Sequence, residues 1–159
     1  MKVKEIMTRY PVCCLPQDTA QSVAQLLRDE DIGSVPVIAD RESQRLEGII
    51  TDRDLCCQII AAGLDPKTTP IGPYITRNLV MCRPEQSLDS CERLMRTHRV
   101  RRMPIVDDQA RCVGILSQAD LARSEEATKV HITVAEISRP SQTIVAMGKA
   151  AGSLWSMTT

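Results

Sequence analysis

The pattern of apolar and polar positions changes its period in the same order in both halves of the chain. Over residues 19–29, apolar residues recur at helical spacing behind Asp18, a good N-cap, and a second helical stripe follows Ser87. Short apolar runs separated by a polar loop follow each stripe, which is typical of paired strands. These runs are 35–39 and 46–50 in the first half, and 103–106 and 112–116 in the second.

The two halves are copies of one unit. Residues 7–16 align without a gap on 75–84, and residues 48–55 align on 114–121. Each copy begins with a β-prone stretch closed by proline, at 12–15 or 80–83, and ends with a second helix that in the first copy stops near Gly63. The predicted order of elements is therefore β-α-β-β-α, twice.

This order divides the chain into four parts. The first repeat takes residues 1–63, a proline-rich connecting loop takes 64–73, and the second repeat takes 74–123. A C-terminal extension follows at 124–159, in which 130–137 is expected to form a strand or a helical turn. We expect the end of this extension to be disordered.

Composition narrows the class of protein. The chain has 159 residues, of which 43% are hydrophobic and only 2% aromatic, so its core must be aliphatic. Because 20 basic residues balance 20 acidic ones, no long-range field toward nucleic acid or anionic membrane is expected. No apolar run is long enough for a signal peptide or a membrane span, so we expect a cytoplasmic protein.

Cysteine and histidine offer little catalytic chemistry. The seven cysteines are odd in number and show no C-x-x-C spacing, which favours reduced thiols that act as small buried hydrophobes. Neither His98 nor His131 stands at a recognisable spacing from cysteine or carboxylate residues. We therefore predict no metal site and no catalytic residue.

One pair of residues recurs where a predicted strand passes into a helix. Thr51 and Asp54 in the first repeat correspond to Ser117 and Asp120 in the second. An ionised aspartate accepts hydrogen bonds from both hydroxyls of a ribose, and a hydroxyl at a helix N-terminus can join backbone N–H groups around a phosphate. The same spacing is also a capping box, which only starts a helix. Its presence at the same place in both repeats favours a binding site.

With these motifs the chain resembles the tandem cystathionine-β-synthase (CBS) domain pair, of the stand-alone bacterial type, over about residues 3–123. The shared features are the repeated unit, the proline-containing strands at 35–38 and 103–106, and the Gly-h-x-Thr/Ser-x-x-Asp ending. The resemblance implies an α/β (α+β) fold of two repeats packed sheet to sheet about a pseudo-two-fold axis. It also implies two clefts that take AMP, ADP, ATP or S-adenosylmethionine as a regulatory ligand, with no required cofactor.

The resemblance also implies roles for single residues. Asp54 and Asp120 would hold the ribose, with Thr51 and Ser117 near the phosphates. The walls around the adenine would be apolar residues: Ile32, Pro36, Met103 and Pro104.

Basic residues distinguish the two expected clefts. In relatives, basic residues just before the proline-containing strand of one repeat reach the nucleotide held by the aspartate of the other repeat. Arg101 and Arg102 occupy that position, so they are expected to provide phosphate contacts in the Asp54 cleft. Their counterparts in the first repeat are Gly33 and Ser34, so the Asp120 cleft is expected to be uncharged.

The sequence thus predicts a non-catalytic regulatory module that senses an adenosine-containing nucleotide. Little besides the repeats is present, so the regulated partner is expected to be a separate chain, and pairs of this kind associate as homodimers through their helices. Two alternatives stay open. One is a structural dimerisation module with empty clefts, and the other is an enzyme that uses a metal or a thiol.

Overall fold

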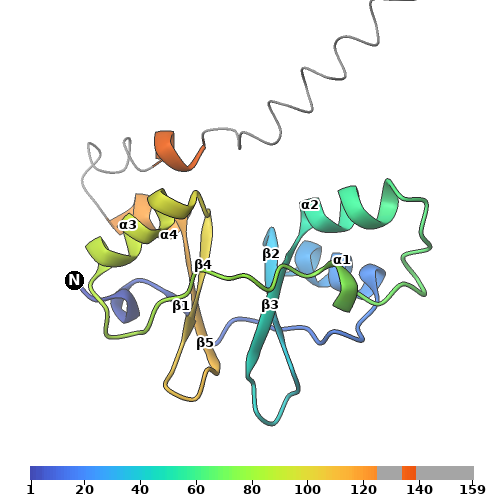
Figure 1. Ribbon diagram of the computed structural model, residues 1–159, viewed down its shortest axis with the longest axis horizontal. Coiled ribbons are helices and arrows are strands. Elements are labelled where there is room, and N and C mark those ends of the chain that lie inside the picture. The colour runs from blue at the N-terminus through green and yellow to red at the C-terminus, as the bar shows by residue number, and fades with distance from the viewer. Residues whose placement is uncertain (125–133, 139–159) are drawn as a thin grey trace, which may run out of the picture.

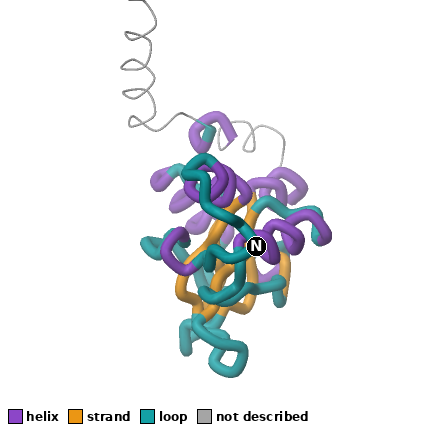
Figure 2. Tube along the Cα trace, turned by 90° about the vertical axis from the view of Figure 1, so that its right-hand side faces the viewer, coloured by secondary structure: helices purple, strands orange, loops and turns teal. Residues whose placement is uncertain are grey.

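The computed structural model describes residues 1–124 and 134–138. Two halves lie side by side, each with a small antiparallel sheet toward the centre and helices on the outside (Figure 1). In a view turned by 90°, the strands form the centre and the helices lie beside and above them (Figure 2). The chain therefore has the mixed α+β fold that the sequence predicts.

The predicted order of helices and paired strands is confirmed in both halves. The first half contains α1 (Ala20–Asp29), β2 (Ser34–Ile38), β3 (Leu46–Thr51) and α2 (Asp52–Asp54), which continues as a π-helix at Leu55–Ile60. The second half contains α3 (Leu88–His98), β4 (Arg102–Val106), β5 (Cys112–Ser117) and α4 (Gln118–Ser124). Short 3-10 helices occupy Val3–Glu5 and Gly72–Tyr74.

The β-prone stretches that open each repeat differ from the prediction. Instead of full strands they form single parallel bridges, Cys14 to Val37 and Cys82 to Ile105. The predicted N-cap of α1 is also wrong. Thr19 caps the helix by accepting the Ser22 N–H at 3.2 Å, because Asp18 already accepts the Leu15 N–H at 2.8 Å in the preceding turn.

Each sheet is extended by a segment from the start of the other repeat. Strand β1 (Thr8–Arg9) pairs with β5, and Thr76 bridges Ile49 on β3. The first glycine of each motif leaves room for the segment from the other repeat to pass close by. A Cβ atom at Gly114 would lie 2.6 Å from the Met7 sulfur, and one at Gly48 would lie 2.8 Å from the Thr76 carbonyl oxygen. The motif glycine is thus a point of close approach.

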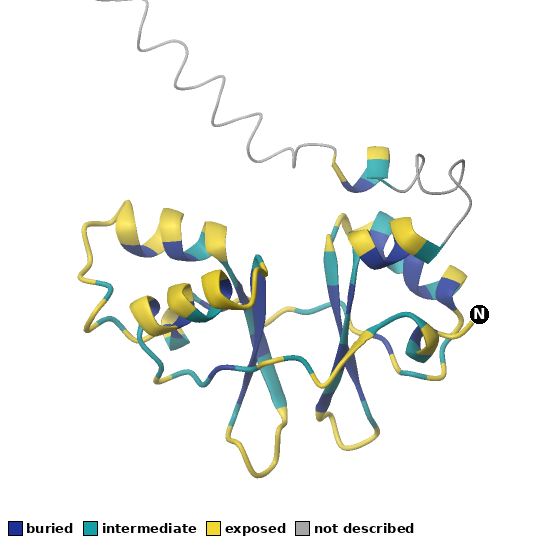
Figure 3. Ribbon diagram, turned by 180° about the vertical axis from the view of Figure 1, so that it is seen from behind, coloured by how far each residue is buried: buried dark blue, intermediate teal, exposed yellow. Residues whose placement is uncertain are grey.

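Each half has its own aliphatic core. The buried strands lie between the helices and the centre of the molecule, whereas the helices expose their outer faces (Figure 3). The first core includes Val23, Val35, Val37, Ile50 and Ile59. The second includes Val3, Leu88, Met95, Met103, Ile105, Leu116 and Ile137. Ile137 lies in a helical turn at 134–137, while the rest of the predicted C-terminal element falls outside the described residues.

The cysteines correct one expectation. Cys82 and Cys91 form a disulfide, so they are not the reduced thiols predicted. The bridge forms because the stretch around Cys82 runs beside the buried face of α3, which carries Cys91. Cys14 and Cys112 are buried free thiols, as predicted, but Cys56 and Cys57 are exposed. The last two lie on the outward face of the π-helix, where no core covers them.

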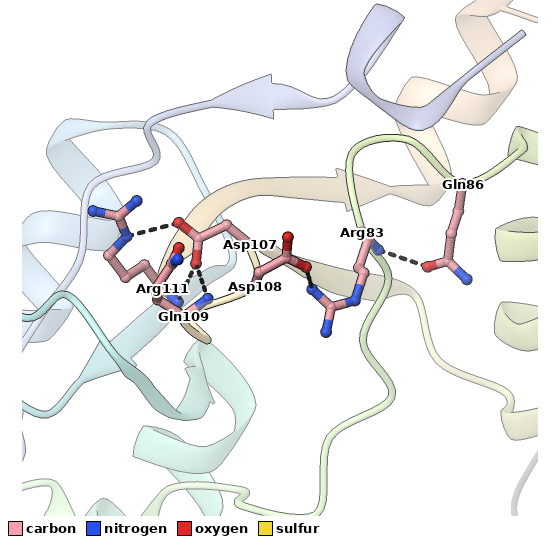
Figure 4. A network of polar contacts seen from close by, with 6 residues as sticks. All are labelled: Arg83, Gln86, Asp107, Asp108, Gln109 and Arg111. Atoms are coloured by element: carbon pink, nitrogen blue, oxygen red, sulfur yellow. Dashed lines mark hydrogen bonds and ion pairs between the residues drawn. The ribbon is translucent and has the colours of Figure 1, made fainter.

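The turn between β4 and β5 is closed by side chains (Figure 4). Asp107 accepts hydrogen bonds from the backbone N–H groups of Gln109 at 3.0 Å and Arg111 at 2.9 Å, and from the Arg111 guanidinium at 2.7 Å. Beside it, Asp108 pairs with Arg83. This network fixes one end of the hairpin and leaves the other end, with Arg102 and Ser117, to form the site.

Candidate functional site

Both hydroxyl-carboxylate motifs lie at the open ends of their hairpins. Because β4 and β5 are antiparallel, Arg102 at the start of β4 lies opposite Ser117 at the end of β5. The first half has the same register, with Ser34 opposite Thr51. The residue that begins each proline-containing strand is therefore a direct neighbour of the motif in its own repeat.

Thr51 and Asp54 form a complete capping box. The Thr51 hydroxyl accepts the Asp54 N–H at 3.1 Å, and Asp54 Oδ2 accepts the Thr51 N–H at 3.0 Å and its hydroxyl at 2.7 Å. The second carboxylate oxygen accepts a hydrogen bond from the Gln58 amide at 3.0 Å. The first motif thus starts a helix, as one of the two interpretations of its spacing requires.

Ser117 and Asp120 repeat this geometry. Asp120 Oδ2 accepts the Ser117 N–H at 2.8 Å and its hydroxyl at 2.6 Å. The other oxygen, Oδ1, accepts a hydrogen bond from the Arg123 guanidinium at 2.5 Å. Only 7% of the Asp120 side chain is exposed, against 73% for Arg123. The second motif therefore holds a buried carboxylate whose outer oxygen pairs with a largely exposed cation.

Asp120 lines a cleft of about 870 Å³ between the two halves, a volume within the range of small-molecule sites. The apolar part of its lining comes from the N-terminal segment and from residues in and just before β2: Tyr10, Pro11, Val12, Ile32 and Pro36. The polar part carries Arg101, Arg102, Ser117, Gln118, Asp120 and Arg123. The cleft thus offers an apolar surface next to a carboxylate and three guanidinium groups.

The structure brings together six of the ten predicted site residues in this cleft. They are Arg101, Arg102, Ser117, Asp120, Ile32 and Pro36. The other four line neither this cleft nor two smaller hollows on the same part of the surface. Met103 is fully buried in the second core, Pro104 pairs with Ile115 inside the sheet, and Thr51 and Asp54 form the first capping box.

The expectation of an uncharged Asp120 cleft is wrong. The antiparallel register of β4 and β5 places Arg101 and Arg102 beside the motif of their own repeat, and Arg101 accepts the Gln118 N–H through its carbonyl at 2.9 Å. Contact between these arginines and a ligand held by Asp54 stays a prediction.

The Arg102 side chain also reaches the first half. A Cβ atom at Gly33 would lie 2.8 Å from Arg102 Nη2 and 3.2 Å from Asp52 Oδ2. The guanidinium thus lies against the bare backbone of Gly33. Within residues 1–124 and 134–138, neither Arg101 nor Arg102 has an ion-pair partner. Both cations are therefore available to an anionic group in the cleft.

Ser34 is a polar group that the folded chain leaves unsatisfied. Its side chain lines the cleft and is 3% exposed, and its hydroxyl has no hydrogen-bond partner among the described residues. Buried hydroxyls nearly always have a partner, so this hydroxyl is an exception among the described residues.

Carboxylates oppose the arginines on the same lining. Glu30, Asp31 and Asp52 face the cleft together with Asp120. Positive and negative groups are thus interspersed, which suits a ligand with both hydrogen-bond donors and an anionic group. Among the described residues, no group of three His, Cys, Asp or Glu could hold a metal ion, and no helix is long and apolar enough to cross a membrane. His131 lies outside the described residues.

Comparison with known proteins decides the family. The model of the CBS domain matches twice, at residues 3–60 and 71–126. The chain belongs to the CBS domain family. The two matches confirm the resemblance inferred from the repeated motif. Tandem CBS domains are generally regulatory modules that bind ligands.

Relatives from two bacteria share most of the chain. Hypoxic response protein 1 of Mycobacterium tuberculosis is 35% identical over 76% of this chain and 82% of its own length. The CBS domain-containing protein YhcV of Bacillus subtilis is 38% identical over the same shares. A crystal structure of hypoxic response protein 1 with two coordinated zinc ions matches with a TM-score of 0.70, at 33% identity over 79% of this chain and all of that one.

A ligand-bound relative shows what one such pair can hold. The CBS domain pair of protein MJ0100, solved with 5′-methylthioadenosine and S-adenosyl-L-methionine, matches with a TM-score of 0.68 and 26% identity over 77% of this chain and 94% of that one. This CBS pair of known structure thus takes adenosyl compounds.

Among the groups that the sequence missed and the structure adds to the cleft are Arg123, Ser34 and the segment Tyr10–Pro11–Val12. Arg123 was detectable, because residues three apart on a helix are neighbours and it follows Asp120 by three positions. Ser34 and the segment Tyr10–Pro11–Val12 carry no local signal, since their place in the cleft depends on the packing of the two halves.

Proposed function

We propose that the Asp120 cleft binds an adenosine-containing ligand with a phosphate group, and that the chain acts as a ligand-sensing regulatory module without catalysing a reaction. The observation that carries the proposal is the meeting, in one cleft, of apolar residues, a buried carboxylate and two guanidinium groups that have no ion-pair partner among the described residues. Each matches a different part of a nucleotide.

The chemistry of the walls suggests one orientation for the ligand. Adenine is flat and largely apolar, so it fits the side formed by Val12, Ile32 and Pro36. The ribose hydroxyls donate to Asp120, whose ionised carboxylate only accepts hydrogen bonds. The phosphate lies toward Arg101 and Arg102, because a guanidinium pairs well with phosphate oxygens. The unsatisfied Ser34 hydroxyl gains a partner on the ligand.

A second ligand position at Thr51 and Asp54 is part of the same proposal. The two motifs have the same capping geometry, and MJ0100 provides an example of a CBS pair solved with two adenosyl compounds. Arg102 lies against Gly33 and near Asp52, so its side chain extends toward the first motif. We expect the Asp54 position to bind more weakly, since no open cleft is lined by its carboxylate in the three hollows described above.

The biological setting stays a set of predictions. A separate regulated protein, homodimerisation through the outer helices, a cytoplasmic location and the division at 1–63, 64–73 and 74–123 are proposed on the sequence pattern. Sedimentation velocity of the purified chain tests the dimer directly.

Calorimetry with matched variants tests the binding proposal. Wild-type protein, Asp120→Asn and Asp54→Asn are titrated with AMP, ADP, ATP, adenosine and S-adenosylmethionine. Asn keeps the size of the side chain but loses the charge, so Asp120→Asn should weaken AMP binding about tenfold or more. Asp54→Asn carries the same change in the same capping box and should leave the stronger site intact.

The outcome also separates the alternatives. If no adenosyl compound binds or raises the melting temperature at millimolar concentration, the sensor proposal fails and a structural module with empty clefts takes its place. Conversion of a bound compound to a new product would favour an enzyme. Equal losses in Asp120→Asn and Asp54→Asn would contradict the assignment of the stronger site.

A further inference from the structure

The acceptor sites of Asp120 are almost filled before any ligand arrives. An ionised carboxylate offers about four lone-pair sites on two oxygens. Oδ2 accepts both the N–H and the hydroxyl of Ser117, and Oδ1 accepts a hydrogen bond from Arg123. A ribose that donates two hydroxyls needs two free sites, and about one remains. The ribose therefore has to displace a protein donor.

Arg123 is the donor that leaves at the lowest cost. The two Ser117 bonds belong to the capping box, so breaking them would also disturb the start of α4. Arg123 is held at its guanidinium end, and its side chain is 73% exposed. An exposed guanidinium is readily rehydrated, so it can swing away without moving the backbone.

Displacement has opposite consequences for neutral and anionic ligands. Asp120 is buried, and exchanging a guanidinium for neutral hydroxyls removes its counter-charge. Adenosine has no anionic group with which the released Arg123 could pair. A ligand with a phosphate gives Arg123 a new anionic partner within the cleft that both residues line, so the charge balance of the site is restored.

We propose that Arg123 is a specificity-determining residue, which competes with neutral adenosine for Asp120 and transfers to the phosphate of a nucleotide. This inference rests on the proposed function, because it assumes that the ribose binds at Asp120. It adds that selectivity against unphosphorylated ligands is built into the contacts of Asp120 within the protein.

The first repeat lacks this device. The position that corresponds to Arg123 is Cys57, an exposed residue, and the outer oxygen of Asp54 accepts instead from the neutral Gln58 amide. An amide has no preference for phosphate that matches that of a guanidinium. The first motif therefore lacks this particular basis for discriminating between adenosine and AMP, which makes Gln58 a matched control position.

The test measures the ratio of the adenosine and AMP dissociation constants by calorimetry. Wild-type protein is compared with Arg123→Ala, Arg123→Lys and Gln58→Ala. In Arg123→Ala, adenosine no longer competes with Arg123 for Asp120, so its dissociation constant should fall. AMP loses a contact to its phosphate, so its dissociation constant should rise. The ratio of the adenosine constant to the AMP constant should therefore fall about tenfold. Arg123→Lys keeps the cation and should recover most of the ratio, whereas Gln58→Ala should leave it unchanged.

The readout separates selectivity from a structural effect. Loss of a fold contact would weaken both ligands together and leave the ratio intact, and thermal unfolding of each unliganded variant reports such a loss. A fall of more than about threefold in the ratio supports the inference, and a smaller change or a rise overturns it. If wild-type protein binds neither ligand, the proposed function has failed. If it binds both but the ratio ignores Arg123, only this inference has failed.

Discussion

The two motifs share a capping box but differ in what surrounds them. Asp54 and Asp120 accept the same pair of hydrogen bonds from the hydroxyl residue three positions earlier. Beside Asp120, the first residue of the adjoining strand is Arg102, and beside Asp54 it is Ser34. The outer carboxylate oxygen meets a guanidinium in one repeat and an amide in the other. Shared spacing therefore builds the helix start, whereas the residues around each motif offer a ligand different charges.

The largest difference between the repeats should appear when each motif glycine is replaced. A Cβ atom at Gly48 meets the Thr76 carbonyl oxygen at 2.8 Å, which belongs to backbone, whereas at Gly114 it meets the movable Met7 sulfur. Gly48→Ala should therefore lower the free energy of unfolding by about 2 kcal/mol, and Gly114→Ala by clearly less. Urea denaturation checks both values, and equal losses would contradict this account of the crossing segments.

Arg102→Ser makes the second repeat resemble the first at the head of the strand. Because a charge-assisted contact with phosphate is lost, AMP should bind about tenfold more weakly. Adenosine, which has no phosphate, should bind as before. Calorimetry with both ligands checks this, and an equal weakening of AMP and adenosine would show that Arg102 does not contact the phosphate.

The capping role can be measured apart from binding. Thr51→Ala and Ser117→Ala each remove an N-cap hydroxyl, so each should lower the free energy of unfolding by about 1 kcal/mol. Only Ser117→Ala should also weaken AMP binding. Chemical denaturation and titration of both variants check the pair. A loss of affinity confined to Thr51→Ala would mean that the wrong repeat has been assigned as the stronger site.

Ser34→Ala separates stability from affinity in the opposite sense. The hydroxyl has no partner in the described part of the chain, so its removal should leave the unliganded protein unchanged or more stable by up to about 1 kcal/mol. Affinity for the ligand should fall, because the ligand loses a hydrogen bond. Thermal melts with and without AMP check both signs, and destabilisation of the unliganded protein would contradict the inference.

The smallest expected effect concerns two adjacent thiols beside the cleft wall. The neighbouring Cys112 side chain lowers the pKa of Cys13, whereas burial raises the pKa of Cys14 to about 12. As pH rises, Cys13 should therefore become a thiolate before Cys14 and react with iodoacetamide before Cys14 does. Mass spectrometry of the alkylated protein measures the two rates. Cys112→Ala should slow the Cys13 reaction, because it removes the hydrogen bond that lowers the Cys13 pKa. Unchanged kinetics in this variant would show that Cys112 does not control Cys13.

Local pattern was enough to predict the fold, because each element carries its own signal. Each of these signals lies within a few positions of the element that it predicts. Examples are the apolar stripe of the helix that ends at Asp29, the proline-containing strands, and the capping residue Ser87. The error at Asp18 arose from two adjacent residues that can both cap, between which only the turn decides. The disulfide was missed because Cys82 and Cys91 meet through the packing of a helix against a loop.

The site was predicted less completely, since it depends on register and on contacts between halves. The sequence identified Ser117, Asp120 and the two arginines, but the pairing of β4 with β5 decided which motif the arginines adjoin. Met103 and Pro104 followed a family pattern and turned out to be core and sheet residues in the structure. Ser34 was recognised only from the structure, in which its buried hydroxyl has no hydrogen-bond partner among the described residues.

The pairing of the start of each repeat with the sheet of the other has a consequence for when the chain can fold. Thr8 pairs with Ile115, so β1 can form its pairing only after β5, which comes much later in the chain, has been synthesised. Pairing between segments so distant in sequence slows folding and delays it until most of the chain is available. Neither repeat can complete its sheet alone, because each sheet uses a segment from the start of the other repeat. The pair should therefore fold and be degraded as one cooperative unit, even though its halves repeat one pattern.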